Sequence, residues 1–394
     1  MLNVEVGRKT TITSLEYILL KDGKAVATNL ETMVVTAVPE ADLTSLIPFK
    51  DVTQVLRYVH GGELLHLETK DSKLSLSWAG GSATFSTEDP ATFPDVPEFV
   101  PEVEESLDSD TLIPALVEIL PYAARDEARP VLNGVTLILG DPVRVAAGDG
   151  YRMADKVLPL SFPKDITMIV PAGSVSVLKH LWERTPRTPP VSDELIPLLV
   201  AKKIAAVSYD GKQGLRFQFG AKTTAIVKLV NGKPPEWLKL IPKGKPSLQV
   251  QVLAPDLAVA AHRVAKVALE EKGIVRLVFT DDSVTVSAKS DGQEVSSSIA
   301  THGSEGAEGK FALGVSYLTG YLSDKQGVVT ISWTGGTAPV AFQSQGSPRV
   351  LIMPMQVRWD AEEKEPEPAE KSEGEPEEEE PAAETPDTEP PEEA

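Results

Sequence analysis

Five histidines and many carboxylates are the residues of this chain best suited to chemistry, and their spacing matches no catalytic motif. The histidines are His60, His66, His180, His262 and His302. None forms the HxxxH or HExxH spacing that places two imidazoles on one helix face around a metal ion. The chain has no cysteine, which excludes disulfides, thiolate nucleophiles and cysteine-based zinc sites. We therefore expect no catalytic residue, no metal site and no cofactor.

The signatures of phosphate-binding loops and nucleophilic hydrolases are also missing. The chain contains neither GxxxxGK[ST] nor GxSxG. The segment GDGYRM, residues 148–153, could suggest a phosphate loop, but it lacks the flanking glycines. We interpret it as a hairpin turn, which is what most Asp-Gly pairs form. An enzyme, for example a hydrolase on a repeated scaffold, is the class of function with the least support.

The negative charge of the chain is concentrated at its end. The net charge is −20, and residues 361–394 contribute −14 of it, with 16 Asp/Glu and two lysines. This segment has no aromatic residue and cannot bury enough surface to offset its ordering entropy, so we expect residues 359–394 to be a disordered acidic tail. The remaining 360 residues carry only −6, which argues against a general nucleic-acid coat protein but allows a basic stripe on one face.

Membrane and export signals are absent from the sequence. No apolar run approaches the roughly 20 residues of a membrane span. The first residues, MLNVEVGRKTT, lack the apolar core of a signal peptide. We expect a soluble, cytoplasmic protein that does not bind membranes.

The elements that would position these residues follow a pattern that occurs three times. A short helix begins after a Pro or Gly signal, with apolar residues spaced for one helical face. Alternating strands, separated by Asp-Gly, Gly-Gly and Gly-Ser turns, precede and follow it. The three helical segments are VTQVLRYV after Pro48, VSVLKHLW after Pro171 and VSYLTGYL after Gly314.

Two of the three copies begin with a longer helix. One is DTLIPALVEILPYAAR, with Asp110 as the expected N-cap and Pro114 in the first turn. The other is APDLAVAAHRVAKVALEEKG, which we expect to end at Gly273. Each copy contains more strand than helix, so the expected fold class is α+β, with antiparallel sheets.

The linkers between the copies define the expected domains. Pro97–Asp108 and Pro242–Ser247 are rich in proline or charge. We therefore expect domains over residues 1–100, 101–245 and 246–358, followed by the tail.

Four segments resemble the beta subunit of bacterial DNA polymerase III, the sliding clamp. They occur in the family's order over about 350 residues, on a threefold repeat, which makes the combined signal specific. Arg129–Leu160 resembles the strand pair with the family's DG[HY]R turn, and Leu229–Pro242 resembles its DG.FPDY...IP linker. Val350–Val357 resembles the ending V.MPMR[LI], and Ala27–Val35 resembles a first-domain strand.

The resemblance implies a ring of two subunits with three domains each, in which helices line a pore and sheets form the outer wall. Such a ring encircles duplex DNA without reading its sequence and gives the replicative polymerase its processivity. It implies as partners the polymerase III alpha subunit, the clamp loader and other proteins with a clamp-binding motif. Their peptides would enter an apolar cleft between the second and third domains.

The residues that the resemblance assigns to this cleft are mostly apolar, and adaptable methionines suit a site that accepts several peptides. They are Leu132, Gly150, Tyr151, Arg152, Met153, Pro235, Leu240, Leu351, Met353, Pro354 and Met355. Without the resemblance, Met353 and Met355 would more often be core residues at the end of a strand.

Basic residues recur on the helices that the resemblance places around the pore, where they would attract phosphates without sequence readout. They are Lys50, Arg57, Arg125, Arg129, Lys179, Arg184, Arg263, Lys266 and Lys325. Ring closure would pair the strand Ala83–Thr87 and the helix near Leu56 with the helix Val264–Leu269 and the strand Val284–Ala288. The residues expected at this dimer interface are Leu56, Ala83, Phe85 and Val267.

Three features depart from the family pattern. Only about ten residues precede the segment TTITSLEYILLKDG, where the family has a strand and a long helix, so the first domain is expected to have one pore helix. Gly148 occupies a position that is usually Thr, and the chain continues 37 residues beyond Val357. These departures leave an alternative open: a degenerate clamp paralogue that docks peptides as a monomer. We also hypothesise that the tail modulates access of partners to the cleft.

Overall fold

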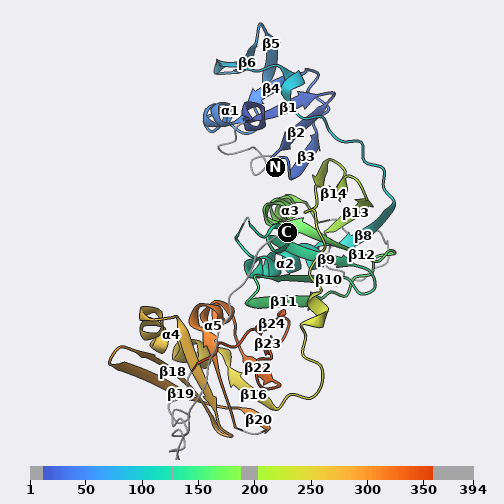
Figure 1. Cartoon of the computed structure of the whole chain (residues 1–394). Coiled ribbons are helices and arrows are strands. Elements are labelled where there is room, and N and C mark those ends of the chain that lie inside the picture. Colours follow the sequence, from blue (N-terminus) through green and yellow to red (C-terminus); the bar gives the residue numbers. More distant parts are fainter. Residues whose placement is uncertain (1–11, 127, 188–202, 307, 358–394) are drawn as a thin grey trace, which may run out of the picture. The chain divides into compact units, whose positions relative to one another are not determined.

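The computed structural model describes residues 12–126, 128–187, 203–306 and 308–357 (Figure 1). This part of the chain combines five α-helices with antiparallel sheets, which confirms the expected α+β class. The expected disordered tail, residues 359–394, lies outside the described residues. The helices are α1 (Phe49–Leu56), α2 (Ser109–Ile119), α3 (Ala172–Arg184), α4 (Ala254–Glu270) and α5 (Val315–Leu322).

The strands fall into three groups along the chain. The first group is β1 (Tyr17–Lys21), β2 (Lys24–Thr28), β3 (Thr32–Ala37), β4 (Ser45–Pro48), β5 (His66–Lys70), β6 (Lys73–Trp78) and β7 (Gly81–Ser86). The second is β8 (Val103–Asp108), β9 (Gly134–Leu139), β10 (Arg144–Gly148), β11 (Arg152–Val157), β12 (Ile166–Pro171), β13 (Ile204–Asp210), β14 (Gly214–Phe219) and β15 (Thr223–Val227). The third is β16 (Leu248–Leu253), β17 (Ile274–Phe279), β18 (Ser283–Ser290), β19 (Gln293–Ala300), β20 (Gly303–Gly306), β21 (Gly309–Gly314), β22 (Val328–Trp333), β23 (Val340–Ser344) and β24 (Arg349–Ile352).

The element order shows the repeat that the sequence predicts. The second and third groups each run strand, helix, strands, helix, strands. In the third group α4 is longer than α5, as expected, but in the second α2 (11 residues) is shorter than α3 (13 residues). Over residues 12–100 the first group has one α-helix, α1, and its last three strands form a sheet of their own. In the second group the last three strands, β13 to β15, are joined by β8 at the outer side of β13. In the third group the last three strands, β22 to β24, are joined in the same way by β16. The linker expected at Pro97–Asp108 therefore contains a strand, because β8 supplies the outer strand of its sheet.

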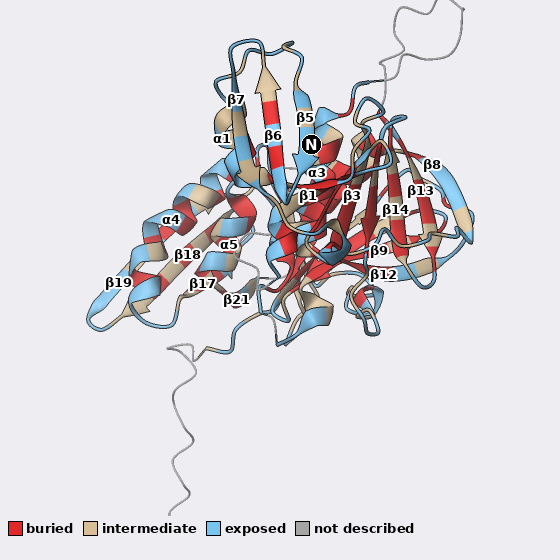
Figure 2. Cartoon of the chain, turned by 90° about the horizontal axis from the view of Figure 1, so that it is seen from above, coloured by how far each residue is buried: buried red, intermediate tan, exposed pale blue. Residues whose placement is uncertain are grey.

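Two sheets cross from one repeat into the next. Strand β15 pairs with β3, placing Ala225 opposite Val34 and completing an eight-stranded sheet. Strand β11 pairs with β24 in a nine-stranded sheet. The described residues up to Met355 consequently form one compact unit, and the three-domain boundaries remain a prediction from the repeat. Buried residues follow the strands and the sheet-facing sides of the helices (Figure 2).

The ends of α2 and α4, the helices that open the second and third repeats, differ in how well the sequence predicts them. Asp108, not Asp110, caps α2, because the helix begins at Ser109; its side chain accepts a hydrogen bond from the amide of Asp110 (2.9 Å). Pro114 consequently lies inside α2 rather than in its first turn. Gly273 does end α4: its φ is +68°, and its amide donates to the carbonyl of Ala268 (2.8 Å). None of the described helices combines the length and apolar character needed to cross a membrane.

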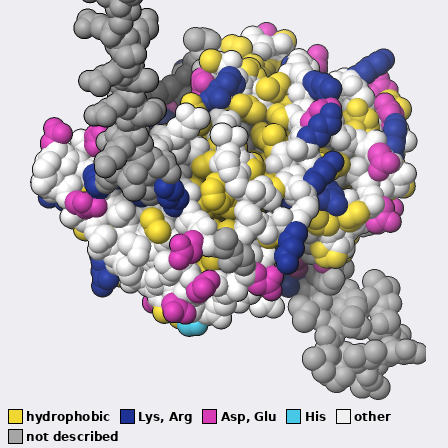
Figure 3. Space-filling view, turned by 60° about the horizontal axis from the view of Figure 1, so that its bottom comes forward, with side chains coloured by type: hydrophobic (Ala, Val, Ile, Leu, Met, Phe, Trp, Pro, Cys, Tyr) yellow, Lys and Arg dark blue, Asp and Glu magenta, His cyan; other side chains and the backbone are white. Residues whose placement is uncertain are grey.

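Apolar side chains also reach the surface. On the face shown in Figure 3 they gather in a central group, with a line of Lys and Arg side chains beside it. The large apolar residues that are exposed include Tyr151, Leu238, Leu240 and Met353. Three of these four come together at the junction of β11 and β24, where the candidate site lies.

Candidate functional site

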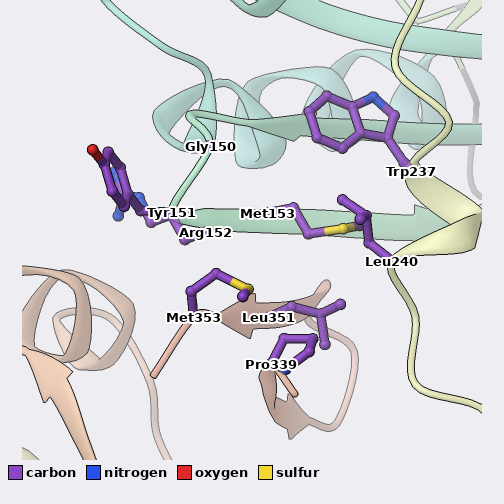
Figure 4. A pocket seen from close by; sticks show the side chains of 9 residues that line it. All are labelled: Gly150, Tyr151, Arg152, Met153, Trp237, Leu240, Pro339, Leu351 and Met353. Carbon is purple, nitrogen blue, oxygen red and sulfur yellow. The ribbon is translucent and has the colours of Figure 1, made fainter. Parts of the chain in front are cut away.

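Pairing of β11 with β24 brings together residues that are about 200 positions apart in the sequence. In this register Met153 lies opposite Leu351 and Arg152 opposite Ile352. Beside the pair is a cavity of about 280 Å³. It is lined by Gly150, Tyr151, Arg152, Met153, Trp237, Leu240, Pro339, Leu351 and Met353 (Figure 4).

The hairpin turn between β10 and β11 forms one rim of the cavity. The Asp149 carboxylate accepts hydrogen bonds from the amides of Tyr151 and Arg152, both 3.0 Å long. Gly150 has a φ of +98°, which favours glycine at the tip. The interpretation of GDGYRM as a hairpin turn is therefore confirmed, and the turn directs Tyr151 and Arg152 to the cavity.

Arg152 is held in place by partners from both sides of the junction. Its Nε atom lies 3.1 Å from Asp149 Oδ2, and its Nη2 donates to the carbonyl of Pro121 (2.9 Å). The guanidinium carbon lies 5.1 Å from the ring centres of both Tyr122 and Tyr317, in cation–π geometry. Burial raises the pKa of Tyr122 to about 12 and also raises the pKa of Tyr317. Both phenols therefore stay neutral beneath the cation at physiological pH.

Tyr151 extends this contact to α5. Its ring stacks on that of Tyr317, with centroids 6.3 Å apart. Its carbonyl also accepts a hydrogen bond from the amide of Met353 (2.8 Å). The rim of the cavity is thus tied to the third repeat by one ring stack and one backbone hydrogen bond.

Trp237 is the main cavity residue that the sequence analysis did not identify. It begins the short 3-10 helix Trp237–Lys239 and is 5% exposed. Its indole N–H donates to Thr136 Oγ1 (2.9 Å), so the one polar atom of the buried ring is paired. The available signal was that Trp237 is the single aromatic residue in the linker motif, and a large aromatic side chain is usually well buried. Pro339, the second missed residue, carries no comparable signal.

Seven of the eleven residues assigned to the cleft line the cavity, and four do not. Leu132 packs against the buried cluster around Met153 and Trp237. The carbonyl of Pro235 accepts a hydrogen bond from the amide of Trp237 (2.9 Å). Pro354 and Met355 follow β24, and the amide of Met355 donates to the carbonyl of Ala312 (2.8 Å). These four support the cavity or lie next to it.

The chemistry available in the cavity is binding. Figure 4 shows the side chains of Met153 and Leu240 facing those of Leu351, Met353 and Pro339 across the cavity. The one charged group in its lining, Arg152, is neutralised by Asp149. The described residues contain no cluster of His, Cys, Asp and Glu suited to a metal ion. An apolar side chain from another molecule would be desolvated here by sulfur, aliphatic and aromatic surfaces.

The basic residues expected to face DNA are exposed, with one exception. Lys50, Arg57, Arg125, Arg129, Lys179, Arg184, Arg263 and Lys266 are all exposed. Some are already engaged: Arg129 pairs with Asp126 at 3.2 Å, and Lys179 lies 3.8 Å from Glu183. The prediction for Lys325 was wrong, because its side chain is 7% exposed and its Nζ atom pairs with Asp324 at 2.8 Å. A cation enclosed in this way cannot reach a phosphate.

The residues expected at a dimer interface differ in how accessible they are. Leu56, Ala83 and Phe85 are half-buried, and β7 is an edge strand. The prediction for Val267 was wrong: it is 6% exposed, on the face of α4 that packs on the sheet. The strand Val284–Ala288 was also wrong as a pairing edge, since β18 is paired on both sides; the free edge belongs to β19.

Comparisons with known proteins agree with one another. Residues 106–236 match the family described as DNA polymerase III beta subunit, central domain. The chain is 24% identical to the beta sliding clamp of Salmonella typhimurium over 375 residues, covering 89% of this chain and 94% of that protein. It is 23% identical to the beta sliding clamp of Synechococcus elongatus over 318 residues, covering 79% and 81%.

Solved structures show the same fold. The DNA polymerase III beta subunit of Thermotoga maritima superposes with a TM-score of 0.78 at 20% identity, covering 91% of this chain and 95% of that one. The beta subunit from Streptococcus pyogenes gives a TM-score of 0.76 at 17% identity, covering 90% and 96%. The repeated α+β architecture is therefore that of these proteins.

Proposed function

Because the chain belongs to the bacterial DNA polymerase III beta subunits, the beta sliding clamps, we propose that it encircles duplex DNA and tethers the replicative polymerase to it. It would do so as a homodimeric ring in the cytoplasm. A member of this family is a non-catalytic accessory subunit of the polymerase holoenzyme. The observation that carries the proposal is the repeat of helix-backed sheets joined edge to edge by β3–β15 and β11–β24, over nearly the whole length of its structural relatives.

Exposed cations on the helices support contact with DNA. Arg184 on α3 and Lys266 on α4 occupy helices of successive repeats, and both side chains are exposed. Lysine and arginine side chains attract phosphates regardless of base sequence, which suits a protein that moves along the duplex. This attraction should weaken as salt is added.

Edge strands on the first and third repeats support ring closure. Strands β7 and β19 each lack a second neighbour among the described residues. An exposed edge invites pairing with another strand, and an antiparallel pair between two subunits would satisfy both edges. Leu56 and Phe85 would lie at such an interface.

The cavity beside β11 and β24 supports peptide docking. Its lining is apolar, and Met153 and Met353 can adapt to different side chains. We assign to it the clamp-binding peptides of the polymerase III alpha subunit, the clamp loader and other partner proteins. Leu132, Pro235, Pro354 and Met355 would support or border the same site.

Light scattering on the full chain tests the ring first. A stable particle of twice 42.3 kDa is expected. In a second step the protein is loaded onto nicked circular DNA and the DNA is then cut. Retention on the circle and release from the linear product are expected, because a closed ring leaves DNA only at an end. A monomer, or equal release from both DNAs, would overturn the encircling function and favour the monomeric peptide-docking alternative.

A further inference from the structure

The linker that forms one wall of the cavity is strongly basic in an acidic protein. Between residues 228 and 245 it carries five lysines and one glutamate, whereas the whole chain has a net charge of −20. We call the five side chains the lysine strip. Its members, all exposed, are Lys228, Lys233, Lys239, Lys243 and Lys245.

The same linker lines two neighbouring cavities. Trp237 and Leu240 face the apolar cavity described above. Immediately afterwards, Ile241, Pro242, Gly244 and Pro246 line a second cavity of about 160 Å³. Polar groups of Gln249, Ser332, Thr334 and Arg349 complete this second cavity. Consecutive parts of the linker therefore line first an apolar cavity and then one with polar groups.

The lysines of the strip differ in whether a carboxylate lies near them. Glu236 lies within ion-pair distance of both Lys233 (3.6 Å) and Lys239 (2.5 Å). Lys243 and Lys245, by contrast, have no acidic partner among the described residues. The guanidinium of Arg349 in the second cavity is occupied by Asp155. These two lysines alternate along the chain with Pro242, Gly244 and Pro246, which line the polar cavity.

We propose that this site takes peptides in which large apolar residues are flanked by acidic ones, and that Lys243 and Lys245 select the acidic flank. The inference rests on the proposed peptide docking and specifies its partner class. The apolar residues enter the cavity between Trp237 and Met353, and the carboxylates lie along the linker. Charge complementarity at an exposed rim contributes a modest, salt-sensitive gain and excludes basic flanks more strongly.

Four fluorescent peptides test the proposal by anisotropy with the full-length protein. Two carry a Leu-Phe anchor with three Glu placed before or after it, and two are matched peptides with Gln in place of Glu. At least one Glu peptide should bind about threefold to tenfold more tightly than its Gln counterpart at low salt. The difference should disappear at high salt and in the Lys243→Gln/Lys245→Gln variant.

A charge-matched control keeps the result specific. Lys70 and Lys73 are exposed and face each other across the β5–β6 hairpin, so Lys70→Gln/Lys73→Gln removes the same charge elsewhere. This control should retain the preference for Glu. Equal binding of Glu and Gln peptides, or a preference that survives loss of Lys243 and Lys245, would overturn the inference while leaving peptide docking intact. Failure of all four peptides to bind would overturn both.

Discussion

The indole of Trp237 occupies the space that a side chain at residue 148 would need. A Cβ on Gly148 would lie 2.8 Å from Cζ3 of the indole and 2.8 Å from the carbonyl oxygen of Arg152. Cβ atoms do not approach other atoms so closely, so the position of the Trp237 ring in the cavity wall depends on glycine at residue 148. The resembling family usually has threonine at this position. Glycine fits here because the indole of Trp237 fills the volume that a threonine side chain would need.

Gly148→Thr should therefore displace Trp237. Overpacking of this kind costs about 1–3 kcal/mol, measured as the free energy of unfolding in urea, and it should weaken binding of an apolar peptide. Combining it with Trp237→Leu should cost less than the sum of the two single variants, because the clash with the ring is removed. Gly61→Thr is the control, since a Cβ there would meet nothing within 4 Å. A Gly148→Thr protein as stable as the control would contradict the coupling.

Asp155 and Arg349 connect the second and third repeats beside the second, polar cavity. Arg349 donates through Nε and Nη2 to the two carboxylate oxygens at 2.9 and 2.8 Å, and Asp155 is 5% exposed. Arg349→Leu should leave a buried carboxylate unpaired and destabilise the protein by about 3 kcal/mol, which urea unfolding would measure. Asp155→Leu combined with Arg349→Leu should recover much of that loss. A double variant that is less stable than Arg349→Leu would show that the pair is not the unit we describe.

The local pattern of the sequence was enough to predict the elements of this fold. Periodic apolar residues located the short helices near Val52, Val177 and Leu318, and Gly273 ended α4 as its type suggests. The start of α2 was missed because Asp108 and Asp110 are equally good caps by type, and only the backbone position of β8 decides between them.

Tertiary burial decided the positions that the sequence placed wrongly. Lys325 has the residue type of a DNA contact, but it packs against Asp324 below the ring of Tyr321. Val267 follows the apolar spacing of α4 and faces the sheet, a direction that a resemblance in sequence does not specify. Met153 and Leu351 could be brought together only through the family pattern, since their contact depends on pairing between distant strands.

Buried tyrosines at the β11–β24 junction should make the protein sensitive to alkali. Burial raises the pKa of Tyr122 to about 12, and it also raises the pKa of Tyr321. In the unfolded chain both phenols ionise near pH 10, so the folded state binds more protons above that pH. Stability should be fully present below about pH 10 and should fall as pH rises toward 12.

Tyr122→Phe should reduce this alkaline loss by about 2 kcal/mol between pH 9.5 and 11.5, measured as the free energy of unfolding in urea at each pH. Tyr321→Phe should in addition stabilise the protein at pH 7 by roughly 1 kcal/mol, because the buried hydroxyl has no hydrogen-bond partner among the described residues. Tyr58→Phe is the control, since Tyr58 is 89% exposed. An alkaline loss in the Tyr122→Phe protein equal to that in the control would contradict the assignment.

Exposed and buried cations should differ in their effect on DNA affinity. Arg184→Gln/Lys266→Gln should weaken binding to a duplex at low salt and lower the slope of log affinity against log salt by about 1–2. Lys325→Gln should leave that slope unchanged and instead reduce stability, because its side chain lies in the protein. Fluorescence anisotropy at several salt concentrations measures both quantities. A reduced slope for Lys325→Gln would restore the original prediction for this residue.

The charge of residues 361–394 should oppose the binding of other polyanions. The segment adds −14 to a remainder of −6, so its removal leaves a chain whose long-range field is much weaker. A protein ending at Asp360 should bind both duplex DNA and an acidic peptide more tightly, by about twofold to tenfold at low ionic strength. The gain should vanish near 0.5 M salt, where the Debye length falls to roughly 4 Å.

A second variant separates charge from length. Replacing the 16 Asp/Glu of this segment by Asn/Gln keeps the chain length and should reproduce the effect of deletion. If only deletion increases affinity, the segment acts by excluded volume rather than by its field. If neither variant differs from the parent at low salt, residues 361–394 do not modulate access of partners.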